Sequence, residues 1–246
     1  MPPLPEPRLC EIPTATGPVM LPYELHRRRG MRYLRVSVNE ADQVTLKVPY
    51  RVSESIAIEY LRQQGEWLLG VLERLPRRWS LSEYVGRKPW LAIMGERFEL
   101  QIEEHRGRTS VQLDRAKEAI TLWLDRRESR EASLKEALTS AAKLVLPPRT
   151  RELARLHGLT VGRISVRDQR TRWGSCSESG NISLNWRLVL LDPRLHDHVI
   201  LHELAHLKHL NHSKAYWNFL GQLDADASRH DLELTRVSSV MMRLGR

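Results

Sequence analysis

The chain reads His202-Glu203-Leu204-Ala205-His206 near its C-terminus, a spacing that is typical of a catalytic zinc site. Two histidines four residues apart lie on one face of a helix, about 6 Å apart along its axis. One zinc ion can bind both imidazoles, and Glu203 can act as general base on the water that the ion activates. The pattern predicts metal-assisted hydrolysis, and a helix with incidental histidines is the alternative.

The residues around this motif predict a largely buried helix that begins at Asp192-Pro193 and continues to about Leu210. Asp is a common N-cap, and Pro fits the first helical position. Apolar residues cover most of the circumference of this segment. Because an unpaired polar group costs roughly a few kcal/mol to bury, the histidines and the glutamate need partners, which a metal and its water supply.

The third protein ligand of a hydrolytic zinc site is predicted to be His212. Asn211 tolerates the left-handed conformation that ends a helix, so the chain can turn there and bring His212 back to the metal. His209 would lie about 10 Å from His202 along the helix axis, too far to bind the same ion easily. Metzincin proteases place their third histidine at the same offset but have glycine at the position of His209. The remaining candidates belong to a following helix: Asp226, His230 and Glu233.

Residues 182–187 alternate apolar and polar side chains, which predicts a strand with one apolar face. Residues 177–181 supply the turn of a hairpin. Zinc peptidases commonly present a strand edge beside the metal, where an extended substrate adds as another strand. We therefore expect Ser183 and Asn185 to bind the substrate. A purely structural hairpin below the zinc helix is the alternative.

Four segments together form a combination of motifs that is more specific than the two histidines and the glutamate alone. They are Trp173-Gly174-Ser175-Cys176, Ile182-x-Leu184-Asn185-Trp186-Arg187-Leu188, the run from His202 to Ser213, and Tyr216-Trp217. This combination resembles the YgjP-like metallopeptidase family, which is related to the SprT-like zinc peptidases. The resemblance is close over about residues 153–223 and looser over the N-terminal half. It implies a zinc peptidase-like domain with one Zn2+ per chain, His202, His206 and His212 as ligands, and Glu203 as base.

The composition limits the class of protein. A chain of 246 residues is long enough for one large or two small domains with a real core. Its two cysteines, Cys10 and Cys176, form no disulfide framework, and we expect Cys176 to be a small buried residue at a tight turn. The N-terminus lacks the apolar core of a signal peptide, and no run of about 18 apolar residues occurs. We therefore expect a cytoplasmic protein without a membrane span.

The formal net charge of +9 suggests acidic partners. Part of the excess lies in Arg27-Arg28-Arg29, Arg32 and Arg35. Nucleic acid or an acidic protein is a possible partner, although no nucleic-acid-binding motif accompanies the charge, and a solvated basic surface is the alternative. The partner that the zinc motif predicts is a peptide or protein substrate.

The pattern of elements predicts an α+β protein: a small, mostly β N-terminal module followed by a zincin-like helical catalytic domain with a short β-sheet. Residues 1–18 are rich in proline and predict a flexible tail. Residues 19–125 predict the module, with a hairpin over 34–48, one helix over 53–75, and four strands between 90 and 124. Residues 126–246 predict the catalytic domain, in which Pro147-Pro148 kinks or breaks a helix before a second helix to about Leu156, and the last helix covers about 226–244.

Three functions are compatible with these motifs. The leading one is a zinc metallopeptidase, with Tyr216 or Arg172 as donor to the developing oxyanion. The second is a basic zinc-containing module that binds nucleic acid or protein, in which His209, His230 or Cys176 would close the site as a fourth ligand. The third is a zinc-dependent nucleotide hydrolase, which would need a phosphate cradle such as a glycine-rich loop, and the sequence has none.

Overall fold

The computed structural model describes residues 8–14, 17–38, 42–75 and 78–246. The chain divides into two compact units, Met1–Arg77 and Arg78–Gly245, and each has its own apolar core. The described residues form seven α-helices and three small sheets, a mixed α and β composition consistent with the predicted α+β class. Among the helices of these ranges, none combines the length and apolar character that crossing a membrane requires.

The N-terminal unit is a four-stranded sheet with two helices. Its elements are β1 (Arg8–Ile12), β2 (Val19–Arg28), β3 (Arg35–Val38), β4 (Val44–Pro49), α1 (Glu54–Gln63) and α2 (Gly65–Arg74). The strand order is β1-β2-β4-β3, in which β2 and β4 are parallel and both outer pairs are antiparallel. The predicted hairpin over 34–48 is therefore confirmed as β3 and β4. The core joins alternate side chains of the strands to Leu61 and Leu68 of the helices.

Two predictions for this unit were wrong. The first was the flexible tail over residues 1–18: residues 8–12 form an edge strand, because Cys10 and Ile12 are buried in the core. Residues 1–7 and 15–16 lie outside the described residues. The single helix expected over 53–75 is two helices that meet at Gln64. A Cβ at Gly65 would collide with the side chain of Ile12, so the glycine allows β1 to pack against the junction.

The C-terminal unit contains the remaining elements. They are α3 (Leu81–Arg87), β5 (Trp90–Ile93), β6 (Glu96–His105), β7 (Ser110–Asp114), β8 (Ala119–Asp125), α4 (Arg130–Leu156), β9 (Ile164–Arg167), β10 (Gly174–Cys176), β11 (Ile182–Asn185), the 3-10 helix η1 (Trp186–Leu190), α5 (Pro193–Ala205), α6 (Lys214–Leu223) and α7 (Ala227–Met241). One sheet has the order β5-β6-β8-β7 and the other β10-β11-β9. Strands β5 to β8 match the four strands predicted between residues 90 and 124.

The first sheet of this unit has the same plan as the sheet of the N-terminal unit. In both, two successive antiparallel hairpins join through their second strands, which pair in parallel, and a helix follows. The sequence shows no repeat that would predict this. The shared plan arises from strand pairing and hydrophobic alternation, which many different sequences satisfy.

The predicted domain boundary after residue 125 does not coincide with the division of the chain, which lies between Arg77 and Arg78. Strands β5 to β8 were assigned to the N-terminal module because they are β-rich. In the structure, Leu91 and Leu122 share one core with Leu138 of α4 and with Leu204 of α5. The sheet therefore belongs to the unit that carries the zinc motif.

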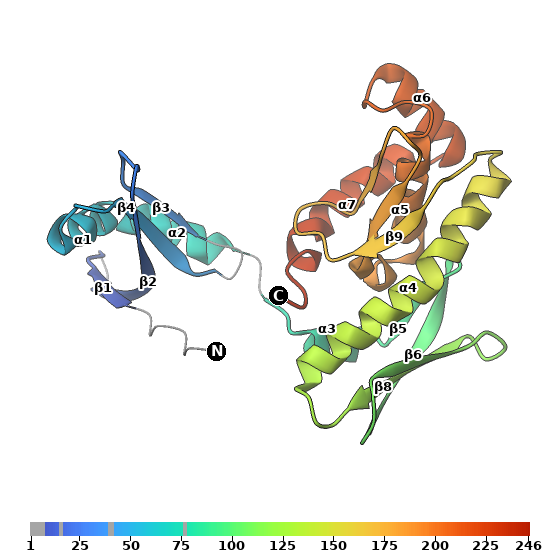
Figure 1. Cartoon of the computed structure of the whole chain (residues 1–246), viewed down its shortest axis with the longest axis horizontal. Helices are drawn as coiled ribbons and strands as arrows, with labels where there is room; N and C mark the ends of the chain where they lie inside the picture. The colour runs from blue at the N-terminus through green and yellow to red at the C-terminus, as the bar shows by residue number, and fades with distance from the viewer. Residues whose placement is uncertain (1–7, 15–16, 39–41, 76–77) are drawn as a thin grey trace. The chain divides into compact units, whose positions relative to one another are not determined.

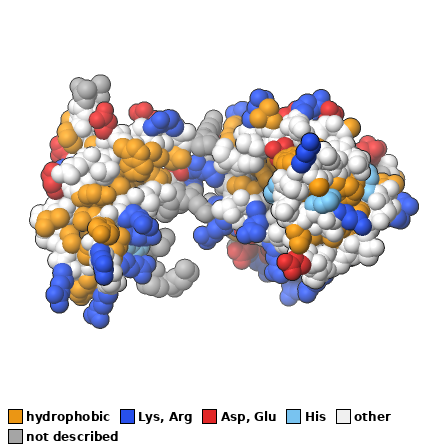
Figure 2. Space-filling view, turned by 90° about the horizontal axis from the view of Figure 1, so that it is seen from above, with side chains coloured by type: hydrophobic (Ala, Val, Ile, Leu, Met, Phe, Trp, Pro, Cys, Tyr) orange, Lys and Arg blue, Asp and Glu red, His pale blue; other side chains and the backbone are white. Residues whose placement is uncertain are grey.

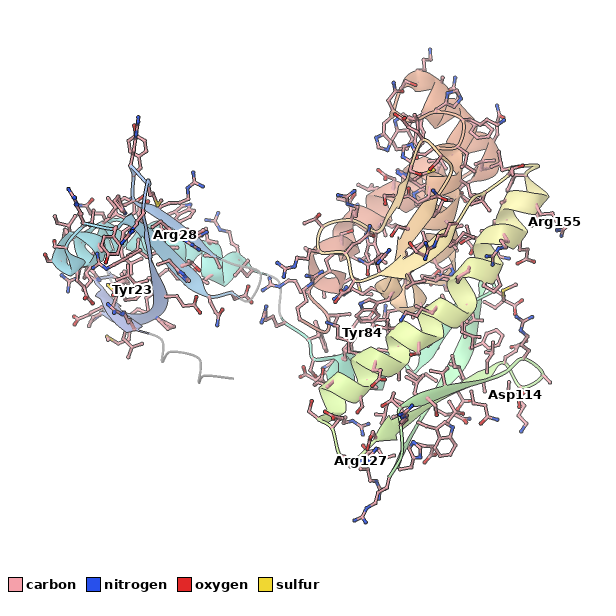
Figure 3. The ribbon with its side chains drawn as sticks, in the orientation of Figure 1. Tyr23, Arg28, Tyr84, Asp114, Arg127 and Arg155 are labelled. Carbon is pink, nitrogen blue, oxygen red and sulfur yellow. The ribbon has the colours of Figure 1, made fainter. Side chains whose placement is uncertain are left out.

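Helix α4 organises the C-terminal unit, with the β5–β8 sheet on one side and η1, β9 and α5 on the other (Figure 1). It begins after a turn in which Arg127, labelled in Figure 3, binds Asp125 at 2.7 Å. The helix continues through Pro147 and Pro148 to Leu156, so of the predicted kink or break the break was wrong, and no separate second helix forms. Prolines remove the hydrogen bonds to the carbonyls of Lys143 and Leu144, but both residues are exposed, so water can satisfy these groups.

The segment after β11 is anchored by a buried arginine. The predicted strand ends at Asn185, and Trp186 and Arg187 belong to η1 instead. The Arg187 side chain is fully buried; it donates to Asp168 Oδ1 at 2.6 Å and to the Leu244 carbonyl at 2.9 and 2.6 Å. These bonds tie the loop before β10 and the C-terminal residues to the start of the zinc-motif helix.

Candidate metal centre

Helix α5 begins as predicted, with Asp192 as N-cap accepting from the Arg194 amide at 3.2 Å and Pro193 in the first turn. It ends at Ala205 rather than near Leu210, and residues 206–208 form a turn. Asn211 has a negative φ, so the predicted left-handed stop was wrong. The earlier helix end takes over that role, because the turn directly after His206 already redirects the chain.

The structure brings together His202, His206 and His212, whose available ligand atoms lie within 4.8 Å of one another. His202 and His206 are contributed by α5 and its C-cap, and His212 by the loop before α6. The Nε2 atoms of His202 and His212 are 3.2 Å apart. His209 is not in the group; its ring packs 5.8 Å from Phe219. Figure 2 shows histidine side chains reaching the surface of this unit.

Burial keeps the imidazoles of His202 and His206 neutral. Burial, and then the charges that His206 and His212 would carry, lower the pKa of His202 to about 3. Burial also lowers the pKa of His206. A neutral imidazole presents a lone pair, which is the form that binds a metal. The donor set and its spacing therefore fit a divalent transition metal.

Two contacts hold the ligand rings in place. His206 Nδ1 donates to the His209 carbonyl at 2.9 Å, which leaves its Nε2 for the metal. Tyr216 stacks on the His206 ring with centroids 4.7 Å apart, and its hydroxyl donates to the His202 carbonyl at 3.3 Å. Tyr216 is fully buried, and burial raises its pKa. Its hydroxyl is thus already used inside the protein, so the expectation that Tyr216 binds an oxyanion was wrong.

Glu203 directly follows His202 in α5 and is only 5% exposed. Its Oε2 atom is buried and has no hydrogen-bond partner among the described residues. Burial raises the pKa of Glu203 to about 8, although the positive charge of Arg172 opposes this shift. Gly174 of β10 lies against the carboxyl group, because a Cβ there would be 2.6 Å from Cγ and 2.7 Å from Cδ of Glu203. The absence of a side chain at residue 174 makes room for this carboxylate.

The sheet topology shows that the prediction of residues 182–187 as a substrate-binding strand was wrong. Strand β11 lies between β10 and β9 and is paired on both edges, so no substrate can add to it. Asn185 is fully buried, and its amide donates to the carbonyls of Gln169 at 2.9 Å and Arg172 at 3.1 Å. Ser183 and Asn185 therefore support the hairpin instead of binding substrate. The hairpin itself, β10 and β11 with its turn at residues 177–181, is confirmed.

The other candidate ligands lie elsewhere. Asp226 binds Arg229 at 2.9 Å, and Glu233 lies 3.9 Å from both Arg194 and Arg229. His230 binds Asp224, which also binds His198, and these three form a second group whose ligand atoms lie within 4.8 Å of one another. The sequence interpretation did not identify this group. The available signal was His198, one helical turn before His202.

The surroundings of Cys176 do not favour the thiolate that a nucleophile requires. Burial and then the nearby charge of Glu203 raise the pKa of its thiol to about 11, which keeps it protonated near neutral pH. Cys176 is half-buried and lies in strand β10, so the expectation of a small buried residue at a tight turn was wrong, although a protonated thiol is consistent with a structural role.

The comparisons with known proteins bear on the whole chain. The family model for the YgjP-like metallopeptidase domain matches residues 32–237, which include most of the N-terminal unit and the complete metal centre. No curated protein and no solved structure matches the chain. The geometry of the three histidines and the match over most of the sequence lead to the same assignment: the chain belongs to the YgjP-like metallopeptidase family.

Proposed function

We propose that this protein is a zinc-dependent peptidase in which Glu203 is the general base. The observation that carries the proposal is the convergence of His202, His206 and His212 beside a buried carboxylate that has no partner among the described residues. Three imidazoles with an open fourth position are the donor set of catalytic zinc. When bound, the ion supplies Lewis acidity, which polarises a carbonyl and lowers the pKa of water towards 7.

The chain's own residues then have separate tasks. His202, His206 and His212 would hold the ion, and the His209 carbonyl fixes the tautomer of His206. Glu203 accepts a proton from the attacking water and later delivers it to the leaving amine. Its raised pKa favours holding the proton between these two steps, and a cation held by the three histidines would favour the ionised form that accepts it.

Arg172 is the remaining candidate for stabilising the developing oxyanion. Its side chain is exposed, and its charge acts on Glu203 against the larger effect of burial, so it lies within electrostatic reach of the base. Guanidinium donors at such a position stabilise negative charge in the transition state.

Substrate binding is better assigned to the outer edge of β10. The amide of Asn185 donates to the Trp173 carbonyl at 2.8 Å, and the amide of Ser177 donates to the Asn181 carbonyl at 2.9 Å. In an antiparallel pair the inward and outward residues alternate, so the backbone groups of Gly174 and Cys176 face away from β11. An extended peptide that pairs with them would lie next to Glu203.

The alternative to a catalytic zinc site is a structural one, in which protein ligands fill all four positions around the ion. It would need a fourth protein ligand. Within the described ranges, the group around His202 contains three residues, and the candidates His209, His230 and Cys176 are outside it. An open position is what hydrolysis requires.

The test measures bound zinc and cleavage of a fluorescently labelled unfolded protein by the parent chain, Glu203→Ala and Glu203→Gln. We expect both variants to keep zinc and to lose turnover by about 10²–10⁴-fold, the usual contribution of a general base. Glu233→Gln, which changes a carboxylate of α7 outside the site, is the matched control and should retain activity. Equal cleavage by the parent and the Glu203 variants would refute the peptidase proposal.

A second candidate function concerns the N-terminal unit. We propose that it binds single-stranded nucleic acid through the Arg27–Arg35 segment. Five arginines and no acidic residue occur between residues 27 and 35. A hollow of about 420 Å³ is lined by Arg28, Arg29, Gly30, Met31, Pro49, Tyr50 and Arg51. Figure 2 shows Lys and Arg side chains gathered beside hydrophobic ones on this unit.

Exposed aromatic rings favour nucleic acid over an acidic protein as the partner. Tyr33 is 79% and Tyr50 56% exposed, and Arg29 lies 5.3 Å above the Tyr50 ring. Rings of this kind stack on bases, while arginines neutralise phosphates. Fluorescence anisotropy with a labelled single-stranded 20-mer should show binding that weakens steeply with salt. Arg28→Ala should reduce the salt slope, and Tyr33→Ala should weaken binding without changing that slope. Equal binding of poly-glutamate would contradict the assignment.

A further inference from the structure

A second cluster of metal-ligating side chains lies one helical turn from the proposed zinc site. His198 belongs to α5, Asp224 follows α6, and His230 belongs to α7. His198 Nδ1 and His230 Nδ1 are 2.7 and 2.8 Å from the same carboxylate oxygen, Oδ2 of Asp224. His198 is 1% and His230 7% exposed. Three separate parts of the chain therefore place their polar groups at one buried point.

Hydrogen bonding alone leaves this cluster incompletely satisfied. Each imidazole has two nitrogens, and the Nε2 atoms of both His198 and His230 are buried without a hydrogen-bond partner among the described residues. An unpaired buried acceptor or donor costs about 1–3 kcal/mol. The rings, whose centroids are 5.6 Å apart, direct Nδ1 and not Nε2 to Asp224, so an ion held at Nδ1 and Oδ2 leaves the Nε2 atoms unchanged; the support for an ion is the convergence of three donors at one buried point.

The donor set has the chemistry of a transition-metal site. Two imidazoles and one carboxylate bind Zn2+, Fe2+ and similar ions. Burial lowers the pKa of His198 and keeps it neutral. Burial also opposes the ionisation of Asp224, but hydrogen bonds from His230 and His198 outweigh it and lower the pKa of the carboxyl group. For an ion to bind at this point, each Nδ1 must give up the proton that it donates to Asp224, which leaves two nitrogen lone pairs and one negative charge around the ion.

The spacing needs only a small adjustment to accept an ion. Zinc lies about 2.0–2.2 Å from nitrogen and oxygen ligands, so donors in a tetrahedral shell are about 3.3 Å apart. The observed separations of 2.7 and 2.8 Å from Asp224 would have to open by about half an ångström. Small side-chain rotations of the two histidines can supply this change.

We propose that His198, Asp224 and His230 form a second divalent-metal site, which takes Zn2+ and ties α5 to α7. It shares no ligand with the first group, although the His198 and His202 rings are only 6.4 Å apart. Because its ligands are buried, the site is structural: it excludes substrate and stabilises the packing of the last helix against the zinc-motif helix.

The test counts zinc ions in the full chain. The purified protein is stripped with a chelator, reloaded with Zn2+, desalted and analysed for metal content. We expect two zinc ions per parent chain, one for Asp224→Asn, one for His212→Gln, and none for the double variant. His209→Gln changes a histidine outside both groups and should retain two. His230→Gln provides a second variant of the new site, and circular dichroism verifies that each variant is folded.

Thermal unfolding supplies a readout that does not depend on activity. In His212→Gln, whose first site is disabled, added Zn2+ should still raise the melting temperature; in the double variant it should not. One zinc per parent chain, unchanged by Asp224→Asn and lost in His212→Gln, would overturn the second site while leaving the first intact. No zinc-dependent rise in the melting temperature of His212→Gln would overturn it as well.

Discussion

Gly174→Ala is the most direct test of how β10 and α5 build the site together. The new methyl group would lie 2.6 Å from Cγ and 2.7 Å from Cδ of Glu203. Carbon atoms rest about 3.5 Å apart, so the carboxyl end of Glu203 must shift by about 0.9 Å. Gly174 has a negative or extended φ, so the substitution adds no backbone strain.

The expected effect is on turnover and not on metal binding. A displacement of about 1 Å in a catalytic group costs about 10²-fold in rate, which corresponds to about 2.7 kcal/mol of transition-state stabilisation. The three histidines do not contact residue 174, so the zinc content should stay the same as in the parent chain. Cleavage of a labelled unfolded protein gives kcat/KM, and elemental analysis gives the zinc content.

Gly221→Ala is the matched control, because an added Cβ on this α6 glycine meets nothing within 4 Å. It should cleave at the parent rate. Full activity in Gly174→Ala would refute the reasoning that the glycine makes room for a base held in one position. Loss of zinc along with activity would also contradict it, since the carboxylate of Glu203 is not a proposed ligand.

Three further predictions concern stability. Arg187→Met removes a fully buried guanidinium that binds Asp168 and the Leu244 carbonyl. It should lower the free energy of unfolding, measured by urea titration, by about 3 kcal/mol. Arg167→Met, which changes an exposed arginine, is the control. Burial disfavours ionised Asp168, but hydrogen bonds from Arg187 and Lys135 outweigh it and lower its pKa below the ordinary 3.8. Its stabilising effect is therefore present above about pH 4 and lost as the pH falls, so the stability difference between the parent and Asp168→Asn should shrink in acid. Pro148→Ala restores a hydrogen bond to the carbonyl of Leu144 in α4, a residue that is exposed. It should raise the melting temperature, with a gain of about 1–3 kcal/mol in the free energy of unfolding. An unchanged or lower melting temperature would show that the helix is already adapted to the proline.

Local signals predicted the parts of the fold that depend on neighbouring residues. The start of α5 at Asp192 and Pro193 follows from capping. Strand alternation likewise located β5 to β8. These features depend on interactions within a few residues, which the sequence displays directly.

The errors arose where distant parts of the chain decide the outcome. The continuity of α4 through two prolines depends on which carbonyls face water, and the sequence does not show that. The pairing of β11 on both edges depends on β9, which precedes it by fifteen or more residues and was not predicted. For the same reason Ser183 and Asn185 were assigned to substrate, although the open edge belongs to β10.

The shortness of β10 limits what the proposed substrate edge can contribute. Only Gly174 and Cys176 direct backbone groups outward, so a paired peptide gains at most four hydrogen bonds. At about 0.5–1.5 kcal/mol each, these amount to about 2–6 kcal/mol before any ordering cost, which corresponds to dissociation constants between about 30 mM and about 40 µM. Backbone pairing at this edge therefore positions a substrate beside Glu203 but does not select one. Selection must come from side-chain contacts beside this edge or from a second binding surface. A weak edge combined with a separate docking surface would restrict cleavage to proteins held by both, which is one physical answer to how an open peptidase site avoids indiscriminate proteolysis.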